Sequence, residues 1–198
     1  MGAVYETIRQ RRTVRRFKDK SIPEETLIKL VDAARLAPSA ENIQPCEYII
    51  VNDSQLKEEV FSCLKWAGYI RPEGNPPEGE KPASYIIVLI NAVLRKKGGE
   101  ADAAAGIENI LLTAWEEGIG GCWLGSINRK KIKKILRIPH HLRVNSVVAL
   151  GYINEHPVAE ELKNSVEYWK DEKGVLHVPK RKLTEIVHKN KYGNCIKL

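Results

Sequence analysis

The sequence predicts an α+β fold in which a β-sheet is flanked by helices. Ser84 to Asn91, apolar without a break from Ile86 to Ile90, and Val144 to Gly151 are both expected to be buried strands. Helical patterns lie between the strands, but few strands are joined by the clean crossover units that a doubly wound parallel sheet requires. We therefore expect an α+β arrangement rather than a doubly wound one.

The first half of the chain is expected to begin with a well-marked helix. Ser21 is a candidate N-cap, Pro23 suits the first turn and Glu24 stands at the capping-box position. The helix should end near Pro38. After it we expect, in order, a polar loop from Pro38 to Pro45, a strand from Tyr48 to Val51 and a helix from Gln55 to Trp66.

The segment from Gly68 to Pro82 carries four prolines and three glycines, a composition that disfavours regular structure. A lid over a site and plain disorder both fit this composition.

The segment from Ala101 to Glu117 is apolar around most of its circumference, which predicts a helix that is covered on all sides. Gly118 is placed to end it in a left-handed turn. The glycine-rich run from Gly118 to Gly125 is not a dinucleotide-binding fingerprint, because it closes a helix rather than opening one. Its glycines serve either close backbone packing or the approach of backbone N–H groups to a flat ligand. Residues Val158 to Trp169 are expected to be helical or irregular.

The bulk composition bounds the class of protein. The chain has 198 residues, of which 43% are hydrophobic and 29% charged, so we expect one globular domain over residues 1–198. No apolar run is long enough to span a membrane and the N-terminus lacks a signal-peptide pattern, so we expect a cytoplasmic protein. The scattered cysteines, which are Cys46, Cys63, Cys122 and Cys195, indicate ordinary thiols rather than a metal knuckle or a disulfide framework.

The net charge of +7 does not by itself identify a partner. The densest basic cluster, from Arg129 to Arg137, has Ile132, Ile135 and Leu136 at helical spacing, which predicts an amphipathic helix with a solvated basic face. Because no aromatic residues interleave with the lysines, we do not expect nucleic-acid binding.

Three arginines and a hydroxyl lie within five residues, at Arg11, Arg12, Thr13 and Arg15. Arginine grips phosphate oxygens with a planar fork of donors, and a nearby threonine can complete the shell of donors. The segment is therefore either a phosphate site or a solvated basic turn.

The usual catalytic arrangements are weak in this sequence. The five histidines show no metal-ligand spacing, so we expect no metal site, and no Gly-x-Ser-x-Gly motif is present. Cys46 has no identifiable histidine partner. Basic clusters near both ends, a polar loop rich in amides and a glycine run favour a bound cofactor that performs the chemistry itself.

Several motifs together resemble one known family. They are Arg-Arg-Thr-x-Arg from Arg11, Ala-Pro-Ser-x-x-Asn-x-Gln-Pro from Ala37, Asn109 within the alanine-rich helix, Gly-x-Gly-x-Cys-Trp-x-Gly from Gly118, and Lys-Arg-Lys from Lys180. In this order, over about residues 5 to 190, the chain is similar to the FMN-dependent nitroreductases.

The resemblance implies a mostly antiparallel central sheet wrapped by helices, in a homodimer with domain-swapped tails and two FMN sites at its interface. It also implies a set of cofactor contacts. Arg11, Arg12, Thr13 and Arg15 would hold the FMN phosphate and ribityl chain, together with Lys180 or Arg181, while Lys182 is a third candidate. Pro38, Ser39, Ala40, Asn42 and Gln44, from the partner subunit, would line the flavin ring, and Leu124 and Gly125 would place backbone N–H groups near it.

By the same resemblance, NADH or NADPH would reduce the flavin and a nitroaromatic, a quinone or a similar small acceptor would reoxidise it. A flavin reductase, a dehalogenase-like enzyme and a flavin-binding protein without turnover are the alternatives with the same fold. A basic nucleic-acid-binding module is the alternative from another class.

Overall fold

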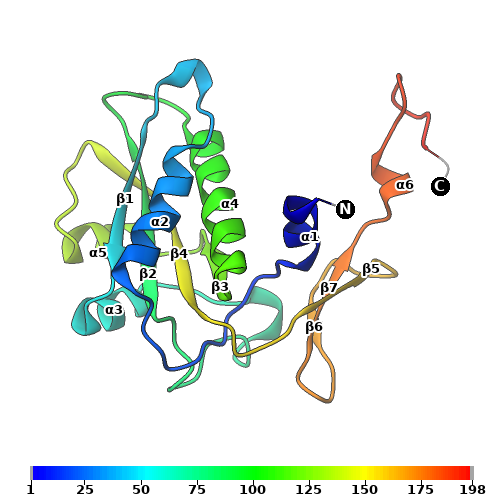
Figure 1. Cartoon of the computed structure of the whole chain (residues 1–198), viewed down its shortest axis with the longest axis horizontal. Helices are drawn as coiled ribbons and strands as arrows, with labels where there is room; N and C mark the ends of the chain where they lie inside the picture. Colours follow the sequence, from blue (N-terminus) through cyan, green and yellow to red (C-terminus); the bar gives the residue numbers. More distant parts are fainter. Residues whose placement is uncertain (1, 197–198) are drawn as a thin grey trace. The chain divides into compact units, whose positions relative to one another are not determined.

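The computed structural model describes residues 2–196, which divide into two compact units between Glu155 and His156. The N-terminal unit is built on a four-stranded antiparallel sheet in the order β1-β2-β4-β3 (Figure 1). Its strands are β1 (Cys46–Val51), β2 (Ser84–Asn91), β3 (Ile119–Leu124) and β4 (Leu142–Tyr152). The α+β class and the antiparallel sheet expected from the sequence are confirmed. The single-domain organisation stays a prediction.

Helices cover both faces of this sheet. They are α1 (Ala3–Gln10), α2 (Glu24–Arg35), α3 (Ser54–Phe61), α4 (Glu100–Glu116) and α5 (Arg129–Ile135), with short 3-10 turns η1 (Ala40–Asn42) and η2 (Gly68–Ile70). On one face, α2 and α4 form the main core against alternate residues of β2, because successive strand residues point to opposite faces. On the other face α3 lies against α5, and Ile132 of α5 is fully buried.

Several helix boundaries differ from expectation. Helix α2 begins after Pro23 rather than Ser21, and no side chain caps it, so the predicted capping box is wrong. Helix α3 ends at Phe61, five residues before the predicted end at Trp66. Gly118 does end α4 in the left-handed region, with φ of +69°. The basic amphipathic helix α5 is present, and Asn128 accepts a hydrogen bond from the Lys131 N–H at its start.

Helix α4 buries one side only within a single chain. Ile107, Ile110 and Ala114 are fully buried in the main core, whereas Ala104 and Leu112 on the other side are only partly covered. The complete cover predicted for this helix is therefore absent from one copy of the described chain.

The loop from Gly68 to Pro82 is ordered by specific contacts. The Phe17 N–H donates to the Glu80 carbonyl at 3.1 Å, and Arg16 pairs with the Glu80 carboxylate at 2.6 Å. Asn154 donates to the other oxygen of that carboxylate at 3.0 Å. Glu80 therefore fastens this loop to the segment that carries the arginines.

The C-terminal unit holds a three-stranded sheet in the order β5-β7-β6. Its elements are β5 (Val158–Glu161), β6 (Trp169–Lys170), β7 (Leu176–Lys180) and α6 (Leu183–Ile186). The segment from Val158 to Trp169, expected to be helical or irregular, thus begins with a strand, which pairs with β7 in parallel. Among residues 2–196, no helix is both long and apolar enough to cross a bilayer.

Candidate functional site

The segment after α1 carries the predicted phosphate ligands along the open edge of the sheet. Strand β3 is an edge strand, and Thr13 forms a parallel bridge with Gly121 on the side away from β4. The Val14 N–H donates to the Gly121 carbonyl at 3.1 Å. The segment therefore continues the sheet for about two residues and places the arginines beside β3.

Two glycines that face each other across β3 and β4 allow this close approach. Gly120 pairs with Gly151 in the sheet register. A Cβ at Gly120 would lie 2.7 Å from Val14, and one at Gly151 would lie 2.7 Å from Phe17. Both apolar side chains are fully buried. The glycine pair thus forms a flat floor on which the segment docks, and this supports the packing interpretation for Gly120.

Just before the first of these buried anchors, the side chains of Arg11 and Arg12 stay partly exposed and close together. Arg11 Nε lies 3.4 Å from Glu108 Oε1 of α4 but makes no hydrogen bond of good geometry there. Arg12 has no carboxylate within ion-pair distance among the described residues. Burial and, after it, the charge of Arg11 hold the pKa of Arg12 below its ordinary value. Positive charge therefore exceeds negative charge at this end of the segment.

Arg15 is placed by contacts that the sequence did not reveal. Its backbone N–H donates to Glu155 Oε1 at 2.5 Å, and the Arg16 N–H donates to the same oxygen at 3.3 Å. Its guanidinium lies beside the thiol of Cys122 on β3, whose pKa burial raises to about 11 against the opposing effect of Arg15. Glu155 and Cys122 are 140 and 107 residues away in the chain, so no local motif indicates either contact.

The end of β3 provides open space. A Cβ at Gly125 would meet no atom within 4 Å, and Trp123 is 43% exposed. Leu124 is buried. Beyond Gly121, no described strand pairs with this edge of the sheet. The arginine segment is thus anchored on β3 at Gly121, and Leu124 and Gly125 end the same strand and the turn after it. A cofactor site shared by Arg11, Arg12, Thr13, Arg15, Leu124 and Gly125 stays a prediction.

The polar loop between α2 and β1 is held in a strained conformation. Glu41, Asn42 and Gln44 have φ of +57°, +54° and +53°, a region that residues other than glycine seldom adopt. The Ser39 hydroxyl accepts from the Gln44 N–H at 3.0 Å, and Asp102 of α4 accepts from the Ala40 N–H at 3.1 Å. Clusters of such conformations are frequent at ligand sites, since the surrounding structure must maintain them.

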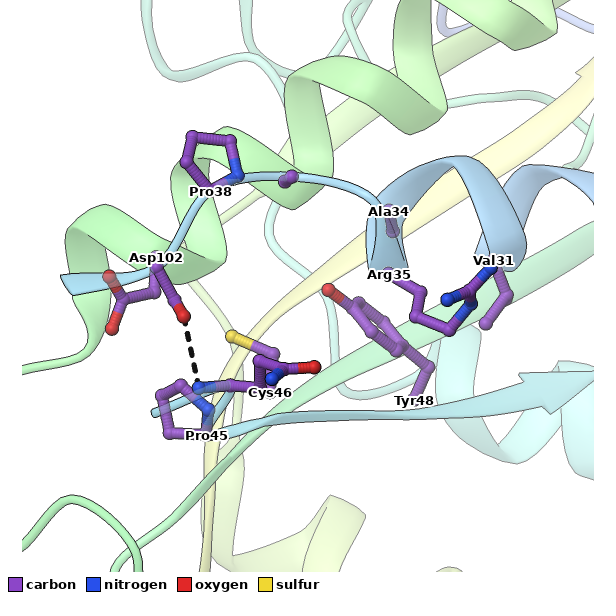
Figure 2. A pocket seen from close by; sticks show the side chains of 11 residues that line it. Val31, Ala34, Arg35, Pro38, Pro45, Cys46, Tyr48 and Asp102 are labelled. Atoms are coloured by element: carbon purple, nitrogen blue, oxygen red, sulfur yellow. Dashed lines mark hydrogen bonds between the residues drawn. The ribbon is translucent and has the colours of Figure 1, made fainter. Parts of the chain in front are cut away.

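A cavity of about 290 Å³ lies under this loop, and Figure 2 shows the side chains that surround it. Its walls are mainly apolar, from Val31, Ala34 and the two prolines that bracket the loop. Cys46 and Tyr48 of β1 also line it, and burial is the main cause that raises the pKa of both groups. This loop is thus a preformed apolar surface with a few amide and hydroxyl groups.

The loop and the arginine segment are held at different points of α4, and Figure 1 shows α1, which precedes the segment, and the loop after α2 beside this helix. Asp102, near the start of the helix, holds the loop, whereas Arg11 reaches Glu108 at its middle and Thr7 of α1 reaches Glu116 at its end. The supply of Pro38, Ser39, Ala40, Asn42 and Gln44 by a partner stays a prediction.

The basic tail lies in the C-terminal unit. Lys180 is the last residue of β7 and has no acidic partner among the described residues. Arg181 lies 3.8 Å from Glu185, and Lys182 lies 3.1 Å from Glu161. Lys180 is therefore the cation of this group that is left unpaired, and its role at a phosphate stays a prediction.

Comparison with known proteins agrees with this fold. A Methanothermobacter thermautotrophicus protein, named as a candidate NADH dehydrogenase/NAD(P)H nitroreductase, is 30% identical over 165 residues, which are 80% of this chain and 82% of that protein. The iodotyrosine deiodinase of Thermotoga neapolitana is 29% identical, over 77% of this chain and 89% of its own. The solved FMN-dependent nitroreductase of Clostridium difficile R20291 superposes with a TM-score of 0.68 at 23% identity, covering 94% of this chain and 98% of its own.

Residues 8–152 match the nitroreductase family, a span that includes the arginine segment, the strained loop and the whole sheet. The chain belongs to the nitroreductase family.

Proposed function

We propose that this protein is an FMN-dependent oxidoreductase that passes hydride from NADH or NADPH to a small acceptor such as a nitroaromatic or a quinone. The observation that carries the proposal is the group of arginines with excess positive charge on a segment that docks on the edge strand β3. The names of its relatives support the reductant and the reaction type. The name of a solved neighbour with the same fold supports the cofactor.

The residues present fit the cofactor. Arg11 Nε is buried without a hydrogen bond, so a phosphate oxygen would satisfy a donor that is otherwise unpaired. Arg12 and Thr13 would complete the phosphate shell, and Arg15 would lie nearer the ring because it stands beside β3. Backbone N–H groups at Leu124 and Gly125 would hydrogen-bond the ring. Bound FMN supplies an acceptor and donor of hydride at N5.

The protein's own contribution is orientation and charge. Fixed N–H donors beside the ring stabilise negative charge that develops there, and they need no rearrangement because β3 holds them in place. The flat surface over Gly125 leaves room for a reductant or an acceptor to lie close to the reacting atoms. No side chain has to donate or accept a proton for this step.

A homodimer would complete the site. On α1, Val4, Tyr5 and Ile8 are 65%, 54% and 49% exposed, and they lie on one side of the helix. The partly covered side of α4 mixes apolar residues, such as Leu112 and Trp115, with polar ones. Apolar side chains that stay exposed in one chain, as on α1, are typical of a subunit interface. A second copy packed there would bring its own Pro38 to Gln44 loop toward the flavin, and Lys180 or Arg181 would join the phosphate.

The test is the affinity for FMN. Arg11→Ala and Arg15→Ala each remove a charge-assisted hydrogen bond, so each should raise the Kd for FMN about 10- to 100-fold and leave the fold intact. Lys18→Ala, an exposed residue at the end of the same segment, is the control of equal charge and should have little effect. Fluorescence titration of the apoprotein with FMN measures all three. A colourless protein that takes up no FMN, or variants with unchanged affinity, would refute the assignment.

Reductive dehalogenation is a second candidate for the same site, favoured by the name of the deiodinase relative. A panel of acceptors offered to the NADH-reduced holoenzyme separates the two candidate functions. Reoxidation by nitroaromatics or quinones without halide release supports the nitroaromatic or quinone reductase, and halide release from an iodinated phenol supports reductive dehalogenation.

A further inference from the structure

A second cavity of the N-terminal unit lies between the end of α3 and the ordered loop from Gly68 to Pro82. Its volume is about 660 Å³, within the usual range of small-molecule sites. Phe61, Trp66 and Pro76 supply apolar walls, and Lys65, Arg71 and Lys81 bring cationic groups to it. We call it the loop cavity.

One residue in the wall of the loop cavity, Trp66, has a buried hydrogen-bond donor without an acceptor in the described chain. Trp66 is only 3% exposed, and its indole Nε1–H has no hydrogen-bond partner among the described residues. A buried donor left unpaired is costly, and native structures seldom keep one without a reason. The indole N–H can only donate, so whatever satisfies it must supply an acceptor atom.

The positive charge at the cavity is only partly neutralised. Lys81 lies 2.8 Å from Glu58 and 2.7 Å from Glu78, so its charge is balanced. Arg71 donates from Nε to the Trp66 carbonyl at 3.2 Å and has no carboxylate within 4 Å in the described chain. Lys65, which is exposed, has no such partner there either. Two cations therefore remain available to an anion in the cavity.

The walls favour an aromatic body. The rings of Phe61 and Trp66 lie 5.8 Å apart with 36° between their planes. Trp66 is almost wholly buried and holds the half-buried ring of Phe61, which is the aromatic surface left at the cavity. An aromatic wall combined with two cations suits an organic anion.

The cavity adjoins the predicted flavin edge. The Lys65 N–H donates to the Ser126 carbonyl at 3.0 Å, and Leu64 forms a bridge with Ile127. Ser126 directly follows Gly125, the residue predicted to face the ring. One wall of the loop cavity is thus fastened one residue beyond the proposed site of hydride transfer.

We propose that the loop cavity binds the anionic group of a reaction partner of the flavin site, with Arg71 and Lys65 as the counter-ions and Trp66 in the wall beside them. This inference rests on the proposed function, in which the reaction partner is either an electron donor or an electron acceptor of the flavin. The anion is either a phosphate of the nicotinamide donor or a carboxylate of the acceptor, and the experiment separates these two sources.

Steady-state kinetics of the FMN-loaded enzyme use one charged and one neutral member for each partner. The donors are NADPH and 1-benzyl-1,4-dihydronicotinamide, and the acceptors are 4-nitrobenzoate and 4-nitrobenzyl alcohol. Arg71→Gln should raise KM about tenfold for the charged member of one pair, without changing kcat or the KM of its neutral counterpart. Lys96→Gln, which changes an exposed lysine outside the cavity, should leave all four KM values unchanged. If Arg71→Gln changes KM equally for the charged and the neutral member of each pair, or changes no KM value, the proposal is overturned.

Direct binding provides a readout that does not depend on turnover. The indole N–H resonance of Trp66, assigned by its loss in Trp66→Phe, should shift when millimolar benzoate or adenosine 2′-phosphate is added to the wild-type protein. Arg71→Gln should weaken that shift. A protein that binds no FMN but shows the shift would refute the proposed function and leave the cavity assignment standing. An active, FMN-bound enzyme in which neither anion moves the resonance would refute the cavity assignment alone.

Discussion

Gly120→Ala tests whether the glycine floor positions the arginine segment. A Cβ at residue 120 would lie 2.7 Å, 2.8 Å and 2.9 Å from the Cβ, Cγ2 and Cγ1 atoms of Val14. Carbon atoms in ordinary contact are about 3.5–4.0 Å apart, so the overlap is about 0.7 Å or more. Rotation of Val14 cannot relieve it, because all of its side-chain carbons are too close.

The segment must therefore move away from β3. Overpacking of a filled core costs about 1–3 kcal/mol, and we expect Gly120→Ala to lower the free energy of unfolding by about 2 kcal/mol. The displacement also moves the Val14 N–H away from the Gly121 carbonyl, and with it the neighbouring arginines. Affinity for FMN should fall together with stability.

A double-mutant cycle with Val14→Ala checks the cause. Val14→Ala alone should destabilise through the lost burial of two methyl groups, by about 1–2 kcal/mol. The double variant lacks two of the three carbons that clash with the new methyl group, while the Cβ of residue 14 remains. The overlap is therefore partly relieved, and the two single losses should add to more than the double variant shows. Urea unfolding of the apoprotein gives the free energies, and FMN titration gives the affinities. Additive losses, or a Gly120→Ala protein as stable as the wild type, would refute the reasoning.

The remaining predictions concern the C-terminal unit, the thiols and one helix cap. Hydrogen bonds to Glu160, and then to Asp171, raise the pKa of His177, so the stability that its charge contributes is complete below about pH 6.5 and is lost as pH rises through the folded pKa. The pKa values of both carboxyl groups are lowered. For Glu160 the main cause is the hydrogen bond from the Trp169 indole, and for Asp171 it is the hydrogen bond from the Val175 N–H. Their contribution is present above about pH 4 and is lost as pH falls further. NMR titration of the His177 ring should therefore give a midpoint above about 6.5, and a lower one would contradict the network. At pH 8 a thiol reagent should react rapidly with the exposed Cys195 but not with Cys122, whose pKa is about 11, so Cys195→Ser should abolish the fast phase. Asp53→Ala removes the side chain that caps α3 at 2.9 Å and should lower the unfolding free energy by about 1 kcal/mol, whereas an unchanged urea midpoint would show that the cap contributes nothing.

Local patterns predicted β1, β2 and β4, but not β3 or the strands of the C-terminal unit. The apolar run from Ser84 to Asn91 matched β2 residue for residue, because a strand buried on both faces has no polar positions to confuse its limits. The arginine cluster was visible from the sequence alone, where it fitted either a phosphate site or a solvated basic turn. The capping box at Ser21 was misleading, because the chain enters α2 through Pro23 with no side chain in capping position.

Contacts distant in sequence could not be predicted in this way. Nothing in the chain near Arg15 indicates Glu155, and nothing near the proline-rich loop indicates that Glu80 would be held by Arg16 and Asn154. Whether that loop was ordered depended on these partners, since its composition alone opposes regular structure.

The sequence by itself determined the α+β class, the residue types of the candidate flavin site and the family resemblance, because these follow from local periodicity and from short motifs. Only the tertiary structure decided that Gly120 and Gly151 lie side by side as a floor for Val14 and Phe17. It also decided that the strained loop contacts the start of α4 and the arginine segment its middle. The physical reason is that close packing and hydrogen bonding join residues more than a hundred positions apart, and no local pattern in the chain records which of them will meet.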